Sequence, residues 1–222
     1  MKRLTLSLAA IGLVVACSQA NDGTQAQVTS GSTPRLHPTQ AACVTYEMTG
    51  QMQSGTTTRC HRDWAYEQYE IQNVSIGFAG MSQTQNSHTI TIGDTIYNID
   101  VAAGTGTQTT NPMYDGMVAA LQNSSSEDMT AAFFAQMGMS ATGQTKTIAG
   151  ESCAVYSSQM MGTVCMTDGG LMLEQSMMGM GQIATSISIG DGGDDANYTL
   201  YQNVTLTQGP DLSNGLQGLI NP

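Results

Sequence analysis

The sequence has few charges, few aromatic residues and few prolines. Only 10% of its 222 residues are charged, 5% are aromatic, and proline occurs five times. So low a charge is unlike a charged disordered chain or a coiled coil. Basic residues are especially scarce, because six Lys and Arg stand against 17 Asp and Glu. With so few cations the chain cannot neutralise a row of phosphates, and this excludes nucleic acid as a partner.

Long apolar runs are also missing except at the N-terminus, where Leu4 to Ala16 carries no charge and follows Lys2 and Arg3. A helix of this length covers about 20 Å, which is less than the ~30 Å hydrocarbon core of a bilayer. Basic residues followed by a short apolar run are typical of an export signal. We therefore predict a signal peptide over residues 1–16 and no membrane span there.

The end of this run, Val14-Val15-Ala16-Cys17, resembles the lipobox of bacterial lipoproteins, in which the leader is cut before a cysteine that is then acylated. The resemblance implies lipidation of Cys17 in a Gram-negative bacterium. Ser18 after the cysteine implies delivery to the outer membrane, facing the periplasm. The alternative is an ordinary secretory signal that happens to end near a cysteine. Acyl chains contribute about 0.8 kcal/mol per buried methylene, so a lipidated chain stays on its membrane.

Composition divides the mature chain into three parts. Residues 17–40 contain the cysteine and a stretch rich in Gln, Thr, Ser, Asn and Gly, which is typical of a flexible tether. Residues 41–209 are long enough for one domain with a sizeable core. Residues 210–222 lack periodicity and are predicted to form a tail.

Four cysteines remain in the domain, and an even number in an exported chain favours disulfides. They are Cys43, Cys60, Cys153 and Cys165, which allow three connectivities. Two short strand patterns around Cys153 and Cys165 favour that pair, which leaves Cys43 with Cys60. A zinc site is the competing interpretation, but the chain has no Cys-x-x-Cys pair and its histidines, at positions 37, 61 and 88, are scattered.

Alternation of apolar and polar residues predicts strands on both sides of the middle of the chain. A change in the parity of the apolar residues near Gln72-Asn73 predicts a β-bulge. Turn signals at Ser54-Gly55 and Gly93-Asp94 predict two hairpins. The predicted strands cover 44–48, 56–62, 69–78, 89–92, 97–101, 146–148, 152–156, 163–166, 171–175, 183–189 and 198–206.

The middle of the chain has a helical period. Asn111-Pro112 is a helix start, and Ser125 with Asp128 resembles a capping box, so helices are predicted over 112–121 and 126–138. Strands, then two helices, then strands predict an α+β fold. We expect a curved antiparallel sheet, a half-barrel, with the two helices covering its concave face. Their apolar faces carry Met113, Met117, Leu121, Met129, Phe133 and Met137.

Several short motifs resemble an uncharacterised family of bacterial envelope proteins with a LolA/LolB-like half-barrel. They are Ile148-Ala-Gly-Glu-Ser-Cys153, Cys165, Gly169-Gly-Leu-Met-Leu-Glu174, Ala184-Thr185 and Tyr198, with looser matches at 50–55 and 93–100. The resemblance covers about residues 43–207 and implies a cavity for acyl chains under the helices. The chain departs from the family at Met177-Met-Gly-Met-Gly181, where a charged turn is more usual.

Catalytic motifs are not found. Ser152, in Gly150-Glu-Ser152, lacks the second glycine of a nucleophile elbow, and no phosphate loop, dinucleotide fingerprint or zinc helix occurs. The acidic residues Asp191, Asp194 and Asp195 lack the spacing of a calcium loop and are more typical of a solvated turn. We therefore expect neither catalysis nor a cofactor.

Three functions remain open. The first is a non-catalytic lipoprotein that binds a lipid or another hydrophobic ligand through the six helix residues, because methionine adapts to irregular apolar shapes. The second is an envelope interaction module with a filled core and an acidic surface, whose protein partner the sequence does not identify. The third is a Cu(I) binder, because thioethers are soft ligands that could converge at Met177, Met178 and Met180.

Overall fold

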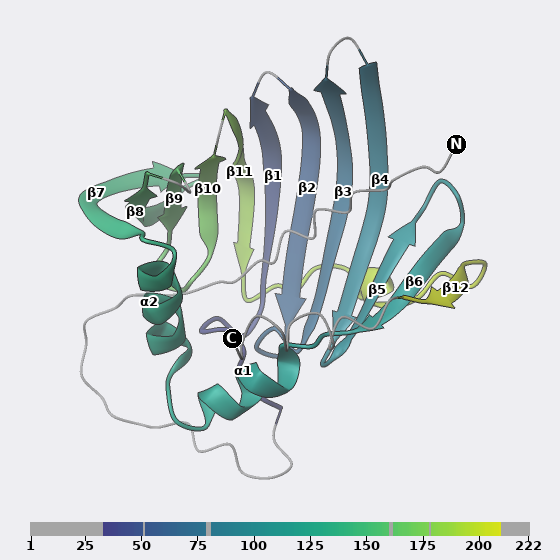
Figure 1. Cartoon of the computed structure of the whole chain (residues 1–222), viewed down its shortest axis with the longest axis horizontal. Coiled ribbons are helices and arrows are strands. Elements are labelled where there is room, and N and C mark those ends of the chain that lie inside the picture. Colours follow the sequence, from purple (N-terminus) through teal and green to yellow (C-terminus); the bar gives the residue numbers. More distant parts are fainter. Residues whose placement is uncertain (1–32, 51, 79–80, 160–161, 178, 210–222) are drawn as a thin grey trace, which may run out of the picture.

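The computed structural model describes residues 33–50, 52–78, 81–159, 162–177 and 179–209 (Figure 1). The predicted signal peptide, Cys17, most of the tether, Met178 and the tail at 210–222 lie outside the described residues. None of the helices in these described ranges has the length and apolar character needed to cross a bilayer.

The prediction of an α+β half-barrel is wrong, because the described chain is mostly β and forms one open sheet of 12 strands with only two α-helices. The first half supplies β1 (Ala42–Gly50), β2 (Gln53–Arg62), β3 (Glu67–Phe78), β4 (Met81–Ile92), β5 (Thr95–Asp100) and β6 (Thr105–Thr110). The second supplies β7 (Ser140–Ile148), β8 (Glu151–Ser158), β9 (Gly162–Met166), β10 (Met172–Met177), β11 (Met180–Ile189) and β12 (Thr205–Gln208).

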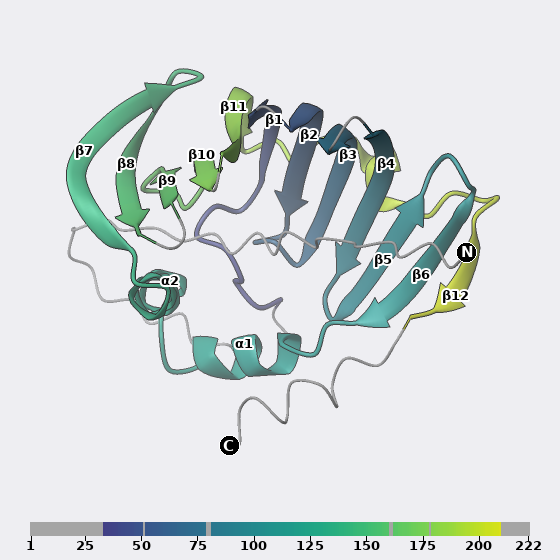
Figure 2. The same cartoon turned by 45° about the horizontal axis from the view of Figure 1, so that its top comes forward.

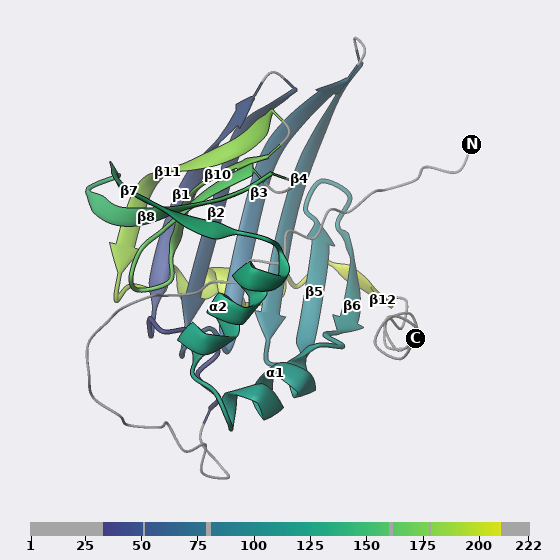
Figure 3. The same ribbon diagram turned by 60° about the vertical axis from the view of Figure 1, so that its left-hand side comes forward.

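The strand order is β12-β6-β5-β4-β3-β2-β1-β11-β10-β9-β8-β7. The sheet is mixed rather than antiparallel, because β12 pairs with β6 in parallel. The two halves of the chain meet where β1 pairs with β11 and again where β12 pairs with β6, and both sheet edges remain open. Figure 2 shows the sheet as an arch with both helices on its inner side, and in Figure 3 the strands β7 to β10 curl towards that side.

Much of the β structure that hydrophobic patterning did not predict is polar. Most residues of β6 (Thr105–Thr110) are Thr or Gln, and almost all of the edge strand β7 is exposed. Threonine favours strands because its branched Cβ fits a pleated surface, but a strand that is polar on both faces shows no alternation. Strands of this kind extend the sheet well beyond the segments predicted from hydrophobic patterning.

The bulge expected near Gln72-Asn73 is also wrong. β3 pairs with β2 and with β4 in unbroken register through these residues. The parity changes because different faces of the strand are buried at its two ends: Tyr69 is buried on one face and Val74 on the other. Irregular register occurs instead at Thr45/Tyr46 in β1 and between Ala141 and Thr145 in β7.

Two buried clusters hold the described sheet together, and each contains one disulfide. The larger surrounds Cys153–Cys165 and includes Val44, Tyr46, Leu173 and Ala184 from β1, β10 and β11. The second surrounds Cys43–Cys60 on the outer face and includes Tyr69 of β3 and Tyr198. Both predicted cysteine pairs are confirmed.

The second cluster is covered by an irregular chain segment, residues 190–201, which we call the outer segment. It passes behind the strands in Figure 1, opposite the helices, and contains the short 3-10 helix Asp195–Tyr198. The strand predicted over 198–206 is therefore wrong except for its end, which belongs to β12. Tyr198 is held under the segment because its hydroxyl donates to the carbonyl of Gly192 at 2.7 Å.

Of the two predicted helix starts, that of the second helix is confirmed by capping bonds. The first helix, α1 (Tyr114–Leu121), begins two residues later than predicted, and its N-cap, Met113, makes no side-chain capping bond. The Met113 amide donates instead to Oδ1 of Asn111 before the helix. Ser125 and Asp128 form the reciprocal bonds of a capping box at the start of α2 (Ser126–Gln136). However, α1 buries none of its residues, so the helices do not seal the inner face of the sheet.

Candidate functional site

The candidate site lies where α1 meets one end of the sheet, and we call it the helix–sheet junction: Tyr66, Asp94, Met113, Tyr114 and Met117. The amide of Asn111, just before α1, donates to the carbonyl of Asp94 in the β4–β5 turn at 2.6 Å. Burial raises the pKa of Tyr114, and the nearby Tyr66 and Asp94 raise it further, which places the first turn of α1 against two strand turns. The start of α1 is thus tied to the sheet.

The other end of the helix pair is tied to the curled strands. Phe134 of α2 lies against the ring of Tyr156 in β8, with 4.9 Å between centroids. It packs with Met139 and Met172 on a small cluster whose buried members are Val164 and Met166. Phe134 has no distinguishing signal in the sequence, because Phe133 fits the helical spacing of the methionines better. The side chain of Phe133 lies outside the described part of the chain.

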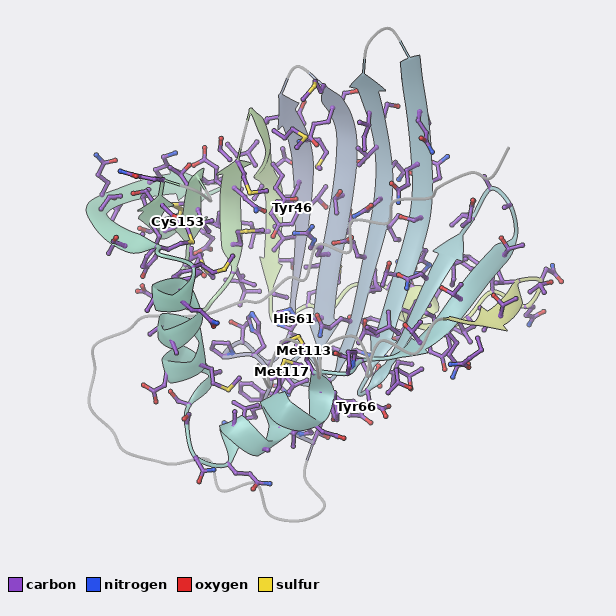
Figure 4. All side chains as sticks on the ribbon, viewed as in Figure 1. Tyr46, His61, Tyr66, Met113, Met117 and Cys153 are labelled. Atoms are coloured by element: carbon purple, nitrogen blue, oxygen red, sulfur yellow. A yellow bond between two sulfur atoms is a disulfide. The ribbon has the colours of Figure 1, made fainter. Side chains whose placement is uncertain are left out.

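Between these two attachments the predicted ligand residues remain partly exposed. Met113 is 45% exposed, and Met117, Leu121, Met129 and Met137 are half-buried. Figure 4 shows Met113 and Met117 projecting from α1 towards the sheet, beside Tyr66 and below His61. The structure therefore brings the two α1 methionines to the junction, while α2 makes its apolar contact with the sheet through Phe134.

The turn that supports the junction has a strained backbone. Asp63, Trp64 and Ala65 all have positive φ angles, of 51°, 58° and 65°. Residues other than glycine avoid this left-handed region, at a cost of about 1–2 kcal/mol each. The turn is held by two contacts with the segment before β1, because the Trp64 amide donates to the Gln40 carbonyl at 2.9 Å and the Arg35 guanidinium lies 4.1 Å from the Trp64 ring centroid.

Two buried histidines lie beside this turn on the inner side of the sheet. His37 and His61 are 2% and 8% exposed, and their ring centroids are 4.2 Å apart. Nδ1 of His37 accepts from the Thr39 amide at 2.9 Å, and Nε2 of His61 lies 3.0 Å from the Thr39 carbonyl. Within the described residues Nε2 of His37 has no hydrogen-bond partner. In the sequence the two histidines are scattered, because their contact joins distant segments.

Burial favours the neutral form of both histidines in this pair. It lowers the pKa of His37 to about 3, and the neighbouring His61 lowers it further, while backbone groups of Thr39 and Gly170 act in the opposite direction. Burial also lowers the pKa of His61, and the Thr39 backbone partly opposes it. Both rings are therefore neutral at pH 7, and they tie the segment before β1 to the sheet through hydrogen bonds rather than charge.

Further along the inner face, one ion pair stands beside an aromatic ring. Arg59 pairs with Glu70 across β2 and β3, and its guanidinium lies 5.3 Å from the Tyr46 ring centroid. Burial raises the pKa of Tyr46 to about 12, and its hydroxyl donates to the Met172 carbonyl at 2.7 Å. These groups satisfy one another, so they join β1, β2, β3 and β10 without presenting an activated nucleophile or base.

The residues considered for metals fall into separate places. No group of three or more His, Cys, Asp and Glu able to hold a metal occurs among the described residues. Asp195 pairs with Arg62, and Asp191 and Asp194 accept bonds from nearby backbone amides of their own turn. Met177 and Met180 lie at the β10–β11 turn, at the opposite end of the strands from the helix–sheet junction.

Comparison with known proteins finds only distant similarity. No family model matches the chain, and no curated protein matches it. An uncharacterised conserved protein from Thermus thermophilus is 5% identical, with a TM-score of 0.47 over 77% of this chain and 91% of that one. MucB is 11% identical, with a TM-score of 0.44 over 74% of this chain and 58% of that one.

A third solved structure, PNGF-II, is 14% identical with a TM-score of 0.34, over 76% of this chain and 31% of that one. The chain therefore spans less than two thirds of the length of MucB and of PNGF-II. At these identities and scores, no ligand or activity transfers from these proteins to this one.

Proposed function

We propose that this protein is a non-catalytic envelope lipoprotein that binds a lipid or another hydrophobic ligand at the helix–sheet junction. The proposal rests on one observation about α1. This helix is attached to the sheet, but its methionines that face the sheet are not buried. Apolar side chains on the protein-facing side of a helix are normally packed, and those left open mark a binding surface.

The side chains at the junction suit a flexible apolar ligand. Methionine is unbranched and polarisable, so Met113 and Met117 can adapt to an acyl chain of variable shape. Covering them gains roughly 25 cal/mol for each Å² of apolar surface removed from water. Tyr66 and Tyr114 lie beside them, and aromatic residues of this kind combine an apolar body with a polar tip.

The ligand proposal can be tested on a chain exported without its lipid. A Cys17→Ser variant would be purified from the periplasm and examined by native mass spectrometry and by titration with a fluorescent fatty acid. We expect bound acyl species and saturable fluorescence. Met113→Asp should abolish both without unfolding the chain, because Met113 is exposed and an acyl chain cannot desolvate a carboxylate.

Met52→Asp is the matched control. Met52 is 40% exposed, close to the 45% of Met113 at the junction, and it lies between β1 and β2 at the other end of the strands. The control should bind like the parent chain. Equal loss in both variants, or no probe binding by the parent, would contradict the proposal and favour an interaction module.

We also propose that Cys17 is acylated and anchors the protein to the periplasmic side of the outer membrane. The support is the sequence Val14-Val15-Ala16-Cys17 after a short apolar run, followed by Ser18. Mass spectrometry of the mature N-terminal peptide should begin at Cys17 and carry acyl chains. Cys17→Ser should move the protein from the outer-membrane fraction to the periplasm, and a mature chain beginning elsewhere would refute the anchor.

A further inference from the structure

The segment before β1 has no regular secondary structure, but it is attached to both halves of the chain. We call residues 33–41 the strap. The Thr39 hydroxyl donates to the carbonyl of Gly169 in the β9–β10 turn at 2.6 Å. The Gln40 carbonyl accepts from the Trp64 amide, just after β2, at 2.9 Å. A small number of directed contacts therefore holds the strap across two parts of the sheet.

The buried histidines lie at the centre of the strap's attachment. His37 belongs to the strap and His61 to β2, with 4.2 Å between their ring centroids. Thr39 bonds to both, because its amide donates to Nδ1 of His37 and its carbonyl lies 3.0 Å from Nε2 of His61. A protonated Nδ1 cannot accept a hydrogen bond, so the bond between His37 and the Thr39 amide exists only while His37 is neutral.

The surroundings of the pair offer no compensation for a positive charge. The charged residues on the adjoining elements are paired with one another or exposed: Arg59 with Glu70, Arg62 with Glu67, and the exposed Arg35, Asp63 and Asp168. Among the described residues, no carboxylate forms an ion pair with either histidine. Protonation of both rings would thus place two like charges close together in a buried site, which is costly.

The turn that the strap holds is strained. Asp63, Trp64 and Ala65 all have positive φ angles, a region that residues other than glycine avoid. The strap is bound to this turn through the Trp64 amide and through Arg35, whose guanidinium lies over the Trp64 ring. Strain of this kind persists only where the surrounding contacts enforce it, so relaxation of the turn favours departure of the strap.

We propose that the strap is an acid-released clasp: protonation of His37 and His61 detaches residues 33–41 from the inner side of the sheet while the strands remain paired. β1 begins at Ala42, directly after the strap, and it pairs with β2 on one side and with β11 on the other. The sheet therefore does not depend on the strap for its own hydrogen bonds.

Release would change the distance between the domain and the membrane. Most of the strap belongs to the predicted tether, residues 17–40, so its detachment lengthens the free part of that tether. This consequence rests on the proposed anchor at Cys17, whereas the release itself does not.

The direction of the pH dependence follows from the two states of the strap. Burial lowers the pKa of His37 in the attached strap to about 3, and the neighbouring His61 lowers it further, while a released strap keeps the ordinary value of 6.5. The released state therefore takes up the proton first as the pH falls below 6.5, which shifts the equilibrium towards release. For His37 alone the shift is roughly tenfold between pH 6 and pH 5.

The test is amide hydrogen exchange by NMR on the mature chain carrying Cys17→Ser, from pH 7 to pH 5. The Thr39 and Trp64 amides report on the strap, because their bonds to His37 and to the Gln40 carbonyl break when it leaves. After correction for the intrinsic exchange rate, we expect their protection to fall roughly tenfold between pH 6 and pH 5. Amides of β3 and β4 should be better protected than these two at every pH, as local release requires.

Two variants and one control separate the clasp from general acid sensitivity. The double variant His37→Gln, His61→Gln keeps polar side chains but cannot titrate, so strap protection should no longer depend on pH. His88→Gln is the matched control, because His88 is also buried, at 1% exposed, but lies on the outer face. It should keep the parent's slope.

A locked chain provides a second test in case the double variant leaves the strap open at every pH. A Cβ on Gly169 would lie 3.0 Å from Oγ1 of Thr39, so Thr39→Cys with Gly169→Cys can form a disulfide that fixes the strap. The Trp64 amide of this chain should stay protected down to pH 5. Acid exposure of Trp64 equal to the parent's would overturn the proposal.

The parent chain and the other variants can also overturn it. Strap protection that stays constant from pH 7 to pH 5 would do so, as would strap and strand amides with equal protection throughout. The same holds if the double variant keeps the parent's slope, or if His88→Gln removes that slope as completely as the double variant does.

Discussion

The two segments that cross the sheet from opposite sides differ in how much they bury. The helix pair has regular structure, yet α1 buries no residue. The outer segment is mostly irregular, but it covers Cys60, Tyr69 and His88, which are 3%, 5% and 1% exposed, and buries its own Tyr198. A segment therefore covers a sheet through side chains that reach it, and regular secondary structure is not needed for that role.

The contacts of the outer segment explain how it buries the side chains beneath it. Tyr198 stacks edge-on against Tyr69 at 4.9 Å between centroids, and the Arg62 guanidinium lies 3.9 Å from the centroid of the Tyr198 ring. The Tyr201 hydroxyl bonds Nδ1 of His88 at 3.0 Å. At Gly193 the backbone comes so close to the Cys43–Cys60 disulfide that a Cβ would contact both sulfurs. The described helix pair has few contacts of this kind, and its methionines remain partly exposed.

The largest difference in stability between the two segments is expected when one side chain of each is truncated to alanine. Tyr198→Ala should lower the free energy of unfolding by about 3–5 kcal/mol, the range for a buried aromatic side chain. Met117→Ala should cost less than about 1 kcal/mol, because its site is already open. Urea denaturation measures the free energy of unfolding of both variants. Equal losses would show that the outer segment and α1 stabilise the fold to the same extent.

Removal of the disulfide under the outer segment is expected to have the next largest effect. Cys43 and Cys60 are 17 residues apart, and a closed loop of this size stabilises by about 3 kcal/mol in the chain-entropy account. The Cys43→Ala, Cys60→Ala double variant should lose that amount and should also speed hydrogen exchange in the outer segment. Exchange in α1 should stay as in the parent, and a change there would show that the two sides are coupled.

Acid should weaken the inner side of the sheet through His37. Its pKa is lowered to about 3 in the fold, mainly by burial, while the unfolded chain keeps the ordinary value of 6.5. Between these values the unfolded state binds the extra proton, so stability falls as the pH falls. From pH 6.5 to 5 the loss is roughly 2 kcal/mol for this one group.

The measurement is urea denaturation at a series of pH values on the parent and on His37→Gln. The variant should have a flatter profile over this range. Burial also lowers the pKa of His88 beneath the outer segment, so His88→Gln tests the same dependence on the other face. An unchanged slope in His37→Gln would show that this histidine does not control acid stability.

The smallest effect is expected at the helix cap. Ser125→Ala removes both side-chain bonds that Ser125 makes with Asp128 and should cost about 1 kcal/mol. Because the contacts described above attach the helix pair near its two ends, the loss should be seen as local fraying of the start of α2 in hydrogen exchange. A comparable drop in global stability would mean that α2 supports the sheet more strongly than its contacts indicate.

Local signals were enough to predict part of this structure. The cysteine pairs, the hairpin at Gly93-Asp94 and the start of the second helix depend on neighbouring residues, and all are found. The fold class was missed because Thr105–Thr110 and much of Ser140–Ile148 carry polar residues on both faces, so burial leaves no pattern in them.

The candidate functional sites also contain residues with a local sequence signal and residues without one. Met113 and Met117 could be named from helical spacing, because one element positions them. The contact of His37 with His61 and the packing of Phe134 on Tyr156 both join residues distant in the chain. Such neighbours depend on strand order and register, which a single sequence does not reveal.

The pairing of β1 with β11 imposes an order on assembly. As the chain emerges N-terminus first, β1 to β6 can pair in sequence, but β1 has no second neighbour until residues 180–189 are available. Closing that long loop before its contacts form is slow. Both disulfides, in contrast, link adjacent strands of local hairpins and can form earlier. The pairing of β1 with β11, like that of β12 with β6, therefore forms after the local hairpins.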